Sequence, residues 1–286
     1  RDFSINAMAL PLSGESPNVI DPHGGLHDLA NGSIAILHSD SFTDDPTRML
    51  RAVRYEQRLG FQIFETTMAG LKKSINEGHV SAVSGDRWRQ EFQKIFDEDR
   101  GFEMFSRAIE IGILPAIHPS LSNDAGLAPL IGQTGLSPCD YLAALVRDLS
   151  PVDGDAVSQR LNLPIDWARM VRDTIALKEI TPTISKMAVK ISEICRLLDG
   201  LDPESIATSA RFSQDAQLAT KLRRYLDEWR LVRTALTGDD LMAMGLAPGV
   251  KIGEVLQELH SAKLDGLISS ETEERALVNQ IISRGS

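Results

Sequence analysis

The sequence predicts a mainly α-helical protein with a small β segment at its N-terminal end. Apolar residues recur at helical spacing along most of the chain, whereas only the first forty residues alternate short apolar segments with turn-forming residues. After residue 44 we expect no strand. The clearest helical stripes are Trp88, Phe92, Ile95 and Phe96; Leu142, Leu145, Val146 and Leu149; Ile191, Ile194, Cys195 and Leu198; and Ile252, Val255, Leu256 and Leu259.

Composition places the chain among ordinary globular proteins. Of its 286 residues, 42% are hydrophobic and 24% are charged, which excludes collagen-like, disordered and coiled-coil classes. The length predicts about two domains. A net charge of -10 argues against non-specific binding of a long polyanion, so any contact with nucleic acid must come from local basic patches. Two cysteines are too few for a disulfide scaffold, and we expect a reducing, cytoplasmic setting.

Three short segments make up the expected β part. Residues 7–12 and 18–21 flank a turn-forming cluster at 13–17 and predict a hairpin, and residues 33–38 predict a third strand. Residues 21–29, with two consecutive glycines, predict a loop. The first helix should begin at Asp45-Pro46, where a capping residue precedes proline, and should run to about Leu59 before Gly60.

Four short motifs in the first hundred residues carry the information about chemistry. In chain order they are Arg1-Asp2-Phe3-Ser4-Ile5-Asn6-Ala7; Asp21-Pro22-His23-Gly24-Gly25 with Asp28-Leu29; Asp44-Asp45-Pro46-Thr47-Arg48-Met49-Leu50-Arg51-Ala52-Val53-Arg54-Tyr55; and Ser84-Gly85-Asp86-Arg87 with Glu91. Together they resemble the tRNA nucleotidyltransferases of bacteria and eukaryotes, a family that includes CCA-, A- and CC-adding enzymes and bacterial poly(A) polymerase. The third motif is the most specific, with Asp44 in place of the family's Glu and Tyr55 in place of its Phe.

Asp45 and Arg48 are the residues that we expect to select the nucleotide base. Three residues apart, they are neighbours on one helix face. A carboxylate accepts hydrogen bonds and a guanidinium donates them, which complements the amino group and ring nitrogen shared by cytosine and adenine. Guanine and uracil present the reverse pattern, so the pair would admit CTP and ATP. The alternative is that Asp45 only caps a helix and Arg48 is a surface charge.

The resemblance also implies roles for the first two motifs. Arg1 would face the triphosphate, while Asp2 and Asn6 would hydrogen-bond the ribose; the alternative for these residues is an ordinary polar face. Gly24 and Gly25 would form a pliable hinge, although the residues alone favour a plain turn.

Three further arginines complete the expected nucleotide site. With Arg51 and Arg54, Arg87 is expected to orient the helix that carries the base-reading pair. Arg51 has two open interpretations, contact with a phosphate or a structural ion pair.

Contacts with RNA are expected from two basic groups. Residues 221–233 predict one basic helix on which three arginines lie within about 80° of each other. Such a stripe would follow the phosphates of a tRNA stem, and the alternative is a solvated helix face. The residues concerned are Arg223, Arg230 and Arg233, with Lys72 and Lys73 as a weaker second group.

No residue of this sequence is predicted to be catalytic or to bind metal. In the family, an Asp-x-Asp pair that precedes the Arg-Asp-Phe motif holds two Mg²⁺ ions for nucleotidyl transfer. No such pair precedes Arg1, so we expect a fragment that is inactive by itself. Asp153-Gly154-Asp155 and Asp239-Asp240 predict helix starts, and His27-Asp28 lies in the glycine loop.

The resemblance implies a head remnant at 1–43, a helical neck at 44–105, a helical body at 106–235 and a helical tail at 236–286. The expected function is addition of CMP or AMP to a tRNA 3′ end by the intact enzyme. The alternatives are a poly(A) polymerase and a non-catalytic RNA-binding protein that lacks the head.

Overall fold

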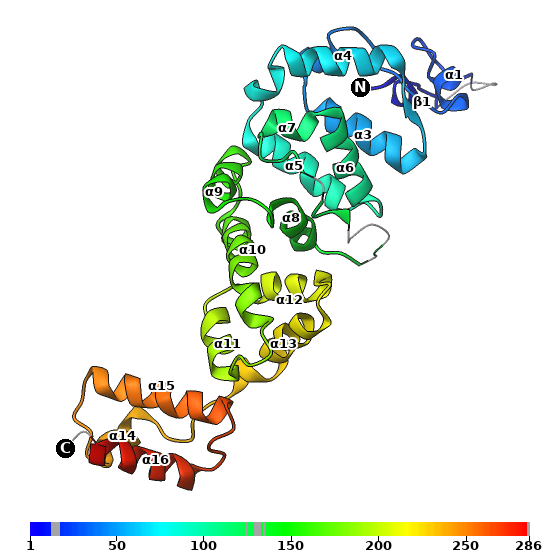
Figure 1. Cartoon of the computed structure of the whole chain (residues 1–286). Helices are drawn as coiled ribbons and strands as arrows, with labels where there is room; N and C mark the ends of the chain where they lie inside the picture. Colours follow the sequence, from blue (N-terminus) through cyan, green and yellow to red (C-terminus); the bar gives the residue numbers. More distant parts are fainter. Residues whose placement is uncertain (13–17, 124, 129–132, 134, 285–286) are drawn as a thin grey trace. The chain divides into compact units, whose positions relative to one another are not determined.

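A computed structural model describes residues 1–12, 18–123, 125–128, 133 and 135–284 (Figure 1). It is 65% helix and 3% strand, which confirms the mainly helical prediction. The chain forms two compact units, residues 1–175 and 176–286. The predicted hairpin turn at 13–17 lies outside the described residues. Among the helices of the described part, none has the length and apolar character needed to cross a membrane.

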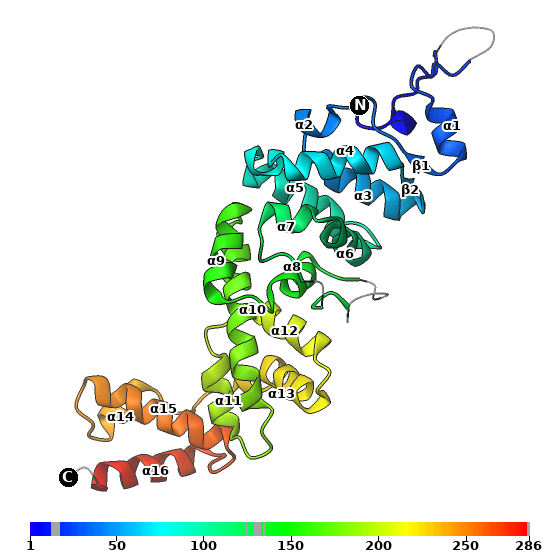
Figure 2. The same ribbon diagram turned by 45° about the horizontal axis from the view of Figure 1, so that its top comes forward.

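The first unit is a helical array with one small sheet. Its elements are the 3-10 helices η1 (Ser4–Asn6) and η2 (His79–Ala82), strands β1 (Ser33–Ile34) and β2 (Gln62–Ile63), and helices α1 (Gly25–Ala30), α2 (Ser41–Asp44), α3 (Arg48–Leu59), α4 (Glu65–Asn76), α5 (Gly85–Phe96), α6 (Gly101–Ile111), α7 (Ile113–Ile117), α8 (Pro138–Val146), α9 (Pro151–Arg160) and α10 (Ile165–Ile184), which continues into the second unit. Helix α3 packs against α5 and α6 (Figure 2). Its buried face, with Leu50 and Val53, and the aromatic pair Phe92 and Phe105 belong to the core of the unit.

The observed sheet is smaller than predicted, and the sequence did not indicate its second strand, β2. β1 and β2 pair in parallel, with Ile34 opposite Ile63, so the expectation of no strand after residue 44 was wrong. β2 is only two residues long, and no periodicity can be recognised over that length. A single antiparallel bridge between Ala9 and Ile20 joins the two flanks of the predicted hairpin.

The predicted loop at 21–29 contains a helix, α1. The carboxylate of Asp21 accepts hydrogen bonds from the backbone N–H groups of Gly25 at 2.7 Å and Leu26 at 2.9 Å, and so satisfies donors at the helix start. Gly24 has a φ of 72°, and a Cβ on Gly25 would lie 2.4 Å from the carbonyl oxygen of Ser4. The backbone conformation of Gly24 and the close packing of Gly25 therefore explain why glycine occupies these two positions, and the hinge stays a prediction.

Helix α3 begins two residues later than predicted, at Arg48 and not at Pro46. Asp45 is an extended residue at the end of α2, with φ of -147° and ψ of 93°, and a turn at Pro46 and Thr47 leads into Arg48. The sequence pattern of a cap followed by proline is present, but the proline lies in the turn. The predicted end of α3 is confirmed, since Gly60 adopts the left-handed conformation at φ of 67°.

The second unit has two hydrophobic clusters. Its elements are α11 (Ile191–Leu198), α12 (Pro203–Phe212), α13 (Ala216–Asp227), η4 (Trp229–Leu231), α14 (Gly238–Ala243), α15 (Val250–Leu264) and α16 (Glu271–Arg284). One cluster includes Cys195 and Leu222, and the other includes Leu241 and Leu259. Glu274 on α16 is fully buried and accepts hydrogen bonds from the N–H groups of residues 235 and 236 and from a lysine on α15. The four predicted helical stripes fall on α5, α8, α11 and α15, although Leu149 lies beyond the end of α8.

The single basic helix predicted for 221–233 is wrong. Helix α13 ends at Asp227, and the chain turns through η4, because Glu228 leaves the helical conformation with φ of -124° and ψ of -63°. Arg223 therefore lies on a helix, whereas Arg230 and Arg233 do not. Arg230 donates to the carbonyl oxygen of Leu226 at 2.8 Å, and Arg233 donates to the carbonyl oxygen of Arg230 at 2.7 Å, so both arginines bond the backbone of this turn.

Candidate functional site

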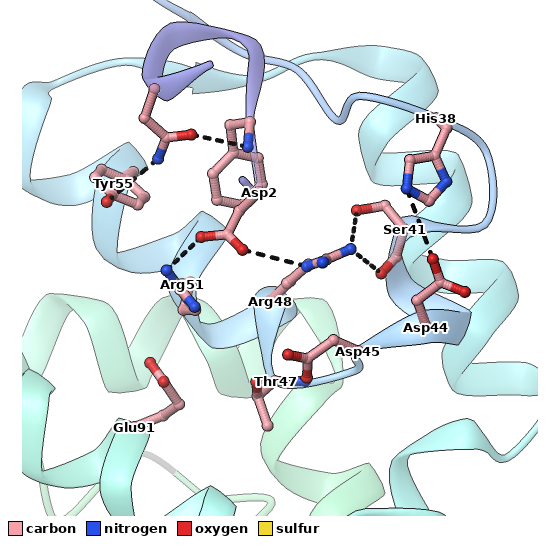
Figure 3. A network of polar contacts seen from close by, with 12 residues as sticks. Asp2, His38, Ser41, Asp44, Asp45, Thr47, Arg48, Arg51, Tyr55 and Glu91 are labelled. Atoms are coloured by element: carbon pink, nitrogen blue, oxygen red, sulfur yellow. Dashed lines mark hydrogen bonds and ion pairs between the residues drawn. The ribbon is translucent and has the colours of Figure 1, made fainter.

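Two arginines of α3 meet an aspartate from the start of the chain (Figure 3). Asp2 is buried, and its Oδ1 accepts a hydrogen bond from Nε of Arg48 at 3.2 Å. Its Oδ2 forms an ion pair with Nη2 of Arg51. Because Arg48 and Arg51 are one helical turn apart, one carboxylate can bond both guanidinium groups. Arg51 was expected either to contact a phosphate or to form a structural ion pair, and in the structure it forms the ion pair with Asp2.

The guanidinium of Arg48 is also held from its other side. Its Nη1 donates to the backbone carbonyl oxygen of Ser41 at 2.9 Å and to the Ser41 hydroxyl at 3.0 Å. Ser41 is the first residue of α2 and is buried. Within the described residues, Nη2 of Arg48 makes no hydrogen bond, so its N–H groups can serve as donors to a ligand.

The carboxylate of Asp45 has different partners. Its Oδ1 accepts hydrogen bonds from the backbone N–H of Thr47 at 3.1 Å and from the Thr47 hydroxyl at 2.7 Å. Its Oδ2 pairs with Nη2 of Arg87 on α5 at 2.7 Å. Burial raises the pKa of Asp45, but the Thr47 hydrogen bonds and the Arg87 charge outweigh burial and lower this pKa below its usual 3.8. The group is therefore ionised near neutral pH and can only accept hydrogen bonds.

The side chains of Asp45 and Arg48 therefore do not bond each other (Figure 3), and the contact between the two residues is made by the backbone, where the N–H of Arg48 donates to the carbonyl oxygen of Asp45 at 3.1 Å. Nor do they share one helix face as predicted, because Asp45 precedes α3. The arrangement leaves a fixed acceptor and a fixed donor near one another, each with bonding capacity unused by the protein.

The remaining predicted nucleotide residues differ in their partners. Asn6 donates from Nδ2 to the hydroxyl of Tyr55 at 3.4 Å, and Arg1 is exposed. Arg54 pairs with Glu98 at 3.5 Å, so it bonds a residue just beyond α5 and not the Asp2 carboxylate. Arg87 reaches Asp45 directly and so touches the predicted acceptor itself.

The predicted RNA residues are divided between the two units, with the two lysines in the first and the three arginines in the second. Lys72 lines a pocket of about 520 Å³ beside β2, together with Gln62 and Phe64. Lys73 pairs with Glu77 at 3.8 Å on the same helix. In the second unit, Arg223 is exposed on α13.

Ser41 and Thr47 are site residues that the sequence reasoning missed. For Thr47 a local signal existed, because Asp side chains often accept a hydrogen bond from the backbone two residues later. For Ser41 we find no signal, since its bond to Arg48 depends on how α2 packs beside α3.

Two of the carboxylates considered as metal ligands have structural partners. Asp153 accepts a hydrogen bond from the hydroxyl of Ser150 at the start of α9, and Asp240 forms a capping box with Thr237 at the start of α14, which confirms both predicted helix starts. In the described part of the chain, no group of three or more His, Cys, Asp or Glu side chains could hold a metal ion. These residues do not fit a two-metal centre, and no reaction step is assigned to one.

Part of the chain matches the sequence model of a known protein family. Residues 60–124 match a family described as the probable RNA and SrmB-binding site of polymerase A. An A-adding tRNA nucleotidyltransferase of Geobacter sulfurreducens is 28% identical over 96% of this chain, and the match covers 34% of that relative. The chain thus spans about a third of that relative's length.

Solved structures extend the similarity to the fold of the whole chain. A CCA-adding enzyme in complex with ATP superposes with a TM-score of 0.80 at 27% identity, covering 100% of this chain and 72% of that one. The CCA-adding enzyme of Thermotoga maritima in complex with tRNA gives a TM-score of 0.76 at 27% identity, with 99% and 72% covered.

Proposed function

Because the chain belongs to the family of tRNA nucleotidyltransferases and poly(A) polymerases, we propose that it selects the nucleotide to be added to a tRNA 3′ end. Its substrates would be CTP and ATP, and its macromolecular partner would be tRNA. The observation that carries this proposal is the separate anchoring of Asp45 and Arg48. Neither neutralises the other, and both keep hydrogen-bonding capacity for a base.

The proposed selection follows from the bonding capacity of the two side chains. Oδ1 of Asp45 already accepts two hydrogen bonds, whereas Oδ2 accepts one ion-pair contact and can accept another. The exocyclic amino group of cytosine or adenine would donate to Oδ2, and the neighbouring ring nitrogen would accept from Nη2 of Arg48. With guanine or uracil, a carbonyl would face the carboxylate and a ring N–H would face the guanidinium, so both contacts would be unfavourable.

Other residues are proposed to hold the rest of the nucleotide and the RNA. Arg1, Asp2 and Asn6 belong to the segment that contacts Arg48 through Asp2, and they would bind the ribose and phosphates. Asp2 already bonds two guanidinium groups, so only its remaining lone pairs could reach a sugar hydroxyl. Arg51 and Arg54 would add positive charge on α3. Contacts with RNA phosphates are proposed for Lys72, Lys73 and Arg223. Arg230 and Arg233 could contact RNA only through the N–H groups that do not already bond the backbone of their turn.

Catalysis is not assigned to this chain's residues. The family resemblance implies that Mg²⁺ ions held by an Asp-x-Asp pair would supply the chemistry of nucleotidyl transfer. No residue of this chain is proposed as part of such a pair, and the contributions proposed for it are base selection and RNA binding.

Replacement of Asp45 by Ala tests the proposal. Dissociation constants for CTP, ATP, UTP and GTP would be measured for both proteins, with a thermal melt for each. We expect the wild type to prefer CTP and ATP, and we expect Asp45→Ala to reduce this preference roughly 5- to 150-fold, the range for a lost bidentate base contact. A variant that melts early but keeps the preference would show that Asp45 only stabilises the fold.

The second candidate is a poly(A) polymerase, because the matched profile carries the description of polymerase A. The chemistry of base selection would then serve ATP alone. Binding of the chain to tRNA lacking its terminal nucleotides, compared with an oligoadenylate of equal length, distinguishes the two. Preference for the oligoadenylate would favour the polymerase.

A further inference from the structure

The Asp45 carboxylate has one buried partner and one half-exposed partner. Thr47, which bonds Oδ1, is 3% exposed, whereas the Arg87 side chain, which pairs with Oδ2, is 49% exposed. Ion pairs that are open to solvent contribute little, because water competes for both charges and the long side chain loses entropy. A buried hydroxyl donating to a carboxylate is a short, charge-assisted bond with few alternatives. Thr47 is therefore the stronger anchor.

The hydroxyl of Thr47 supplies something that its backbone cannot. The backbone N–H donates to Oδ1 at 3.1 Å, and any residue except proline could make that bond. The hydroxyl adds a second bond to the same oxygen at 2.7 Å. Two donors on Oδ1 use both of its lone pairs and fix the rotation of the carboxylate, so that Oδ2 is the atom left for a ligand.

Thr47 also separates the acceptor from the nearby guanidinium. Arg48 follows Thr47 directly, and its Nη2 makes no hydrogen bond within the described residues. If the carboxylate could rotate freely, the oppositely charged group three residues away would compete for it. An Asp45–Arg48 ion pair would use the acceptor and the donor at once.

We propose that Thr47 is a specificity-determining positioning residue, whose hydroxyl fixes the Asp45 carboxylate so that Oδ2 faces the base. This inference rests on the proposed function, since it concerns discrimination among nucleotides at the same site. Thr47 does not touch the nucleotide in this account. Loss of the Thr47 hydroxyl would weaken the binding of CTP and ATP and leave the binding of UTP and GTP unchanged, because the triphosphate and ribose contacts do not depend on that hydroxyl.

The test uses the full chain and the four nucleoside triphosphates as probes, with dissociation constants from isothermal titration calorimetry. Thr47→Val removes the hydroxyl and keeps the branched shape, and Thr47→Ala is a second variant in case the valine methyl disturbs the fold. Thr47→Ser keeps the hydroxyl and should restore discrimination. Thr67→Val is the matched control, because Thr67 is also fully buried and its hydroxyl accepts a hydrogen bond from the N–H of Ile36 at 3.1 Å.

We expect the preference for CTP over UTP, and for ATP over GTP, to fall about fivefold or more in Thr47→Val and Thr47→Ala, as for a lost hydrogen bond to a charged group. Thr47→Ser and Thr67→Val should keep the wild-type preference. If the wild type discriminates and both hydroxyl-free variants discriminate equally well, the inference is wrong while the proposed function stands. If the wild type itself shows no preference, the proposed function fails and this inference fails with it.

Discussion

Replacement of Asp2 by Asn probes the contact that joins the first motif to α3. Asparagine keeps the size of the side chain but removes its charge, and it replaces one acceptor oxygen by an NH₂ donor. One of the two guanidinium groups, Arg48 or Arg51, would then face a donor in place of an acceptor. The other would keep a hydrogen bond to a neutral oxygen.

The magnitude follows from the burial of the three side chains. The side chain of Asp2 is 11% exposed, and those of Arg48 and Arg51 are 18% and 28% exposed. Removing one partner of a fully buried ion pair costs about 3–5 kcal/mol, whereas exposed pairs contribute about 0–1 kcal/mol. Partial exposure and the retained hydrogen bond place this case between the two, at about 2–3 kcal/mol of unfolding free energy. For a unit of 175 residues this corresponds to a melting temperature lowered by roughly 4–12 °C.

Differential scanning calorimetry of the wild type and Asp2→Asn measures the shift directly. The matched control is Asp86→Asn, because the Asp86 side chain is 49% exposed and pairs with Arg89 at 2.7 Å in the same unit. We expect this control to lower the stability by less than about 1 kcal/mol. Equal shifts for the two variants would refute the reasoning, since burial would then not decide the strength of the Asp2 contacts.

Two further predictions concern the same unit. Gly25→Ala should destabilise the unit by about 1–3 kcal/mol in urea unfolding, because the new Cβ would lie 2.4 Å from the carbonyl oxygen of Ser4. Gly70→Ala is the control and should be neutral or stabilising, because the nearest atom to its new Cβ lies at 3.6 Å; equal losses of stability in the two variants would contradict the packing argument. The pKa of Asp45 is lowered in the folded state, so its ionisation stabilises the protein above its usual pKa of 3.8 and this contribution is lost as the pH falls through the lowered value. Asp45→Asn should therefore flatten the fall in melting temperature below about pH 4, and an unchanged acid profile would show that Asp45 does not contribute.

The sequence predicted the helical core because its signal is local. The stripe from Trp88 to Phe96 fell on α5, and Gly60 ended α3 as its conformational freedom suggests. The errors fall at short turns, caps and strands, where the sequence has no periodicity to indicate the backbone conformation. Helix α1 begins where Asp21 caps it, and the break after Asp227 arises at Glu228, whose residue type gives no warning of a turn.

The sequence suggested candidate residues for the site but not their bonding partners. The motif and the chemistry of cytosine and adenine identified Asp45 and Arg48 as candidates. Their partners, Arg87 and Asp2, lie 42 and 46 residues away in the sequence, and hydrogen bonds over such separations cannot be read from spacing. Arg87 was expected to orient a helix, and the structure instead pairs it with the carboxylate.

The anchors explain how two opposite charges can stay apart at so short a sequence separation. A carboxylate and a guanidinium three residues apart attract each other by about 0.2–0.5 kcal/mol on a helix surface. Each hydrogen bond to a charged group contributes about 1.5–3 kcal/mol, and Arg48 makes such bonds to Asp2 and Ser41 while Asp45 makes them to Thr47. The anchors therefore outweigh the local attraction. Because the proposed selection of a base needs both groups unpaired with each other, weakening one anchor should reduce discrimination well before the fold is lost.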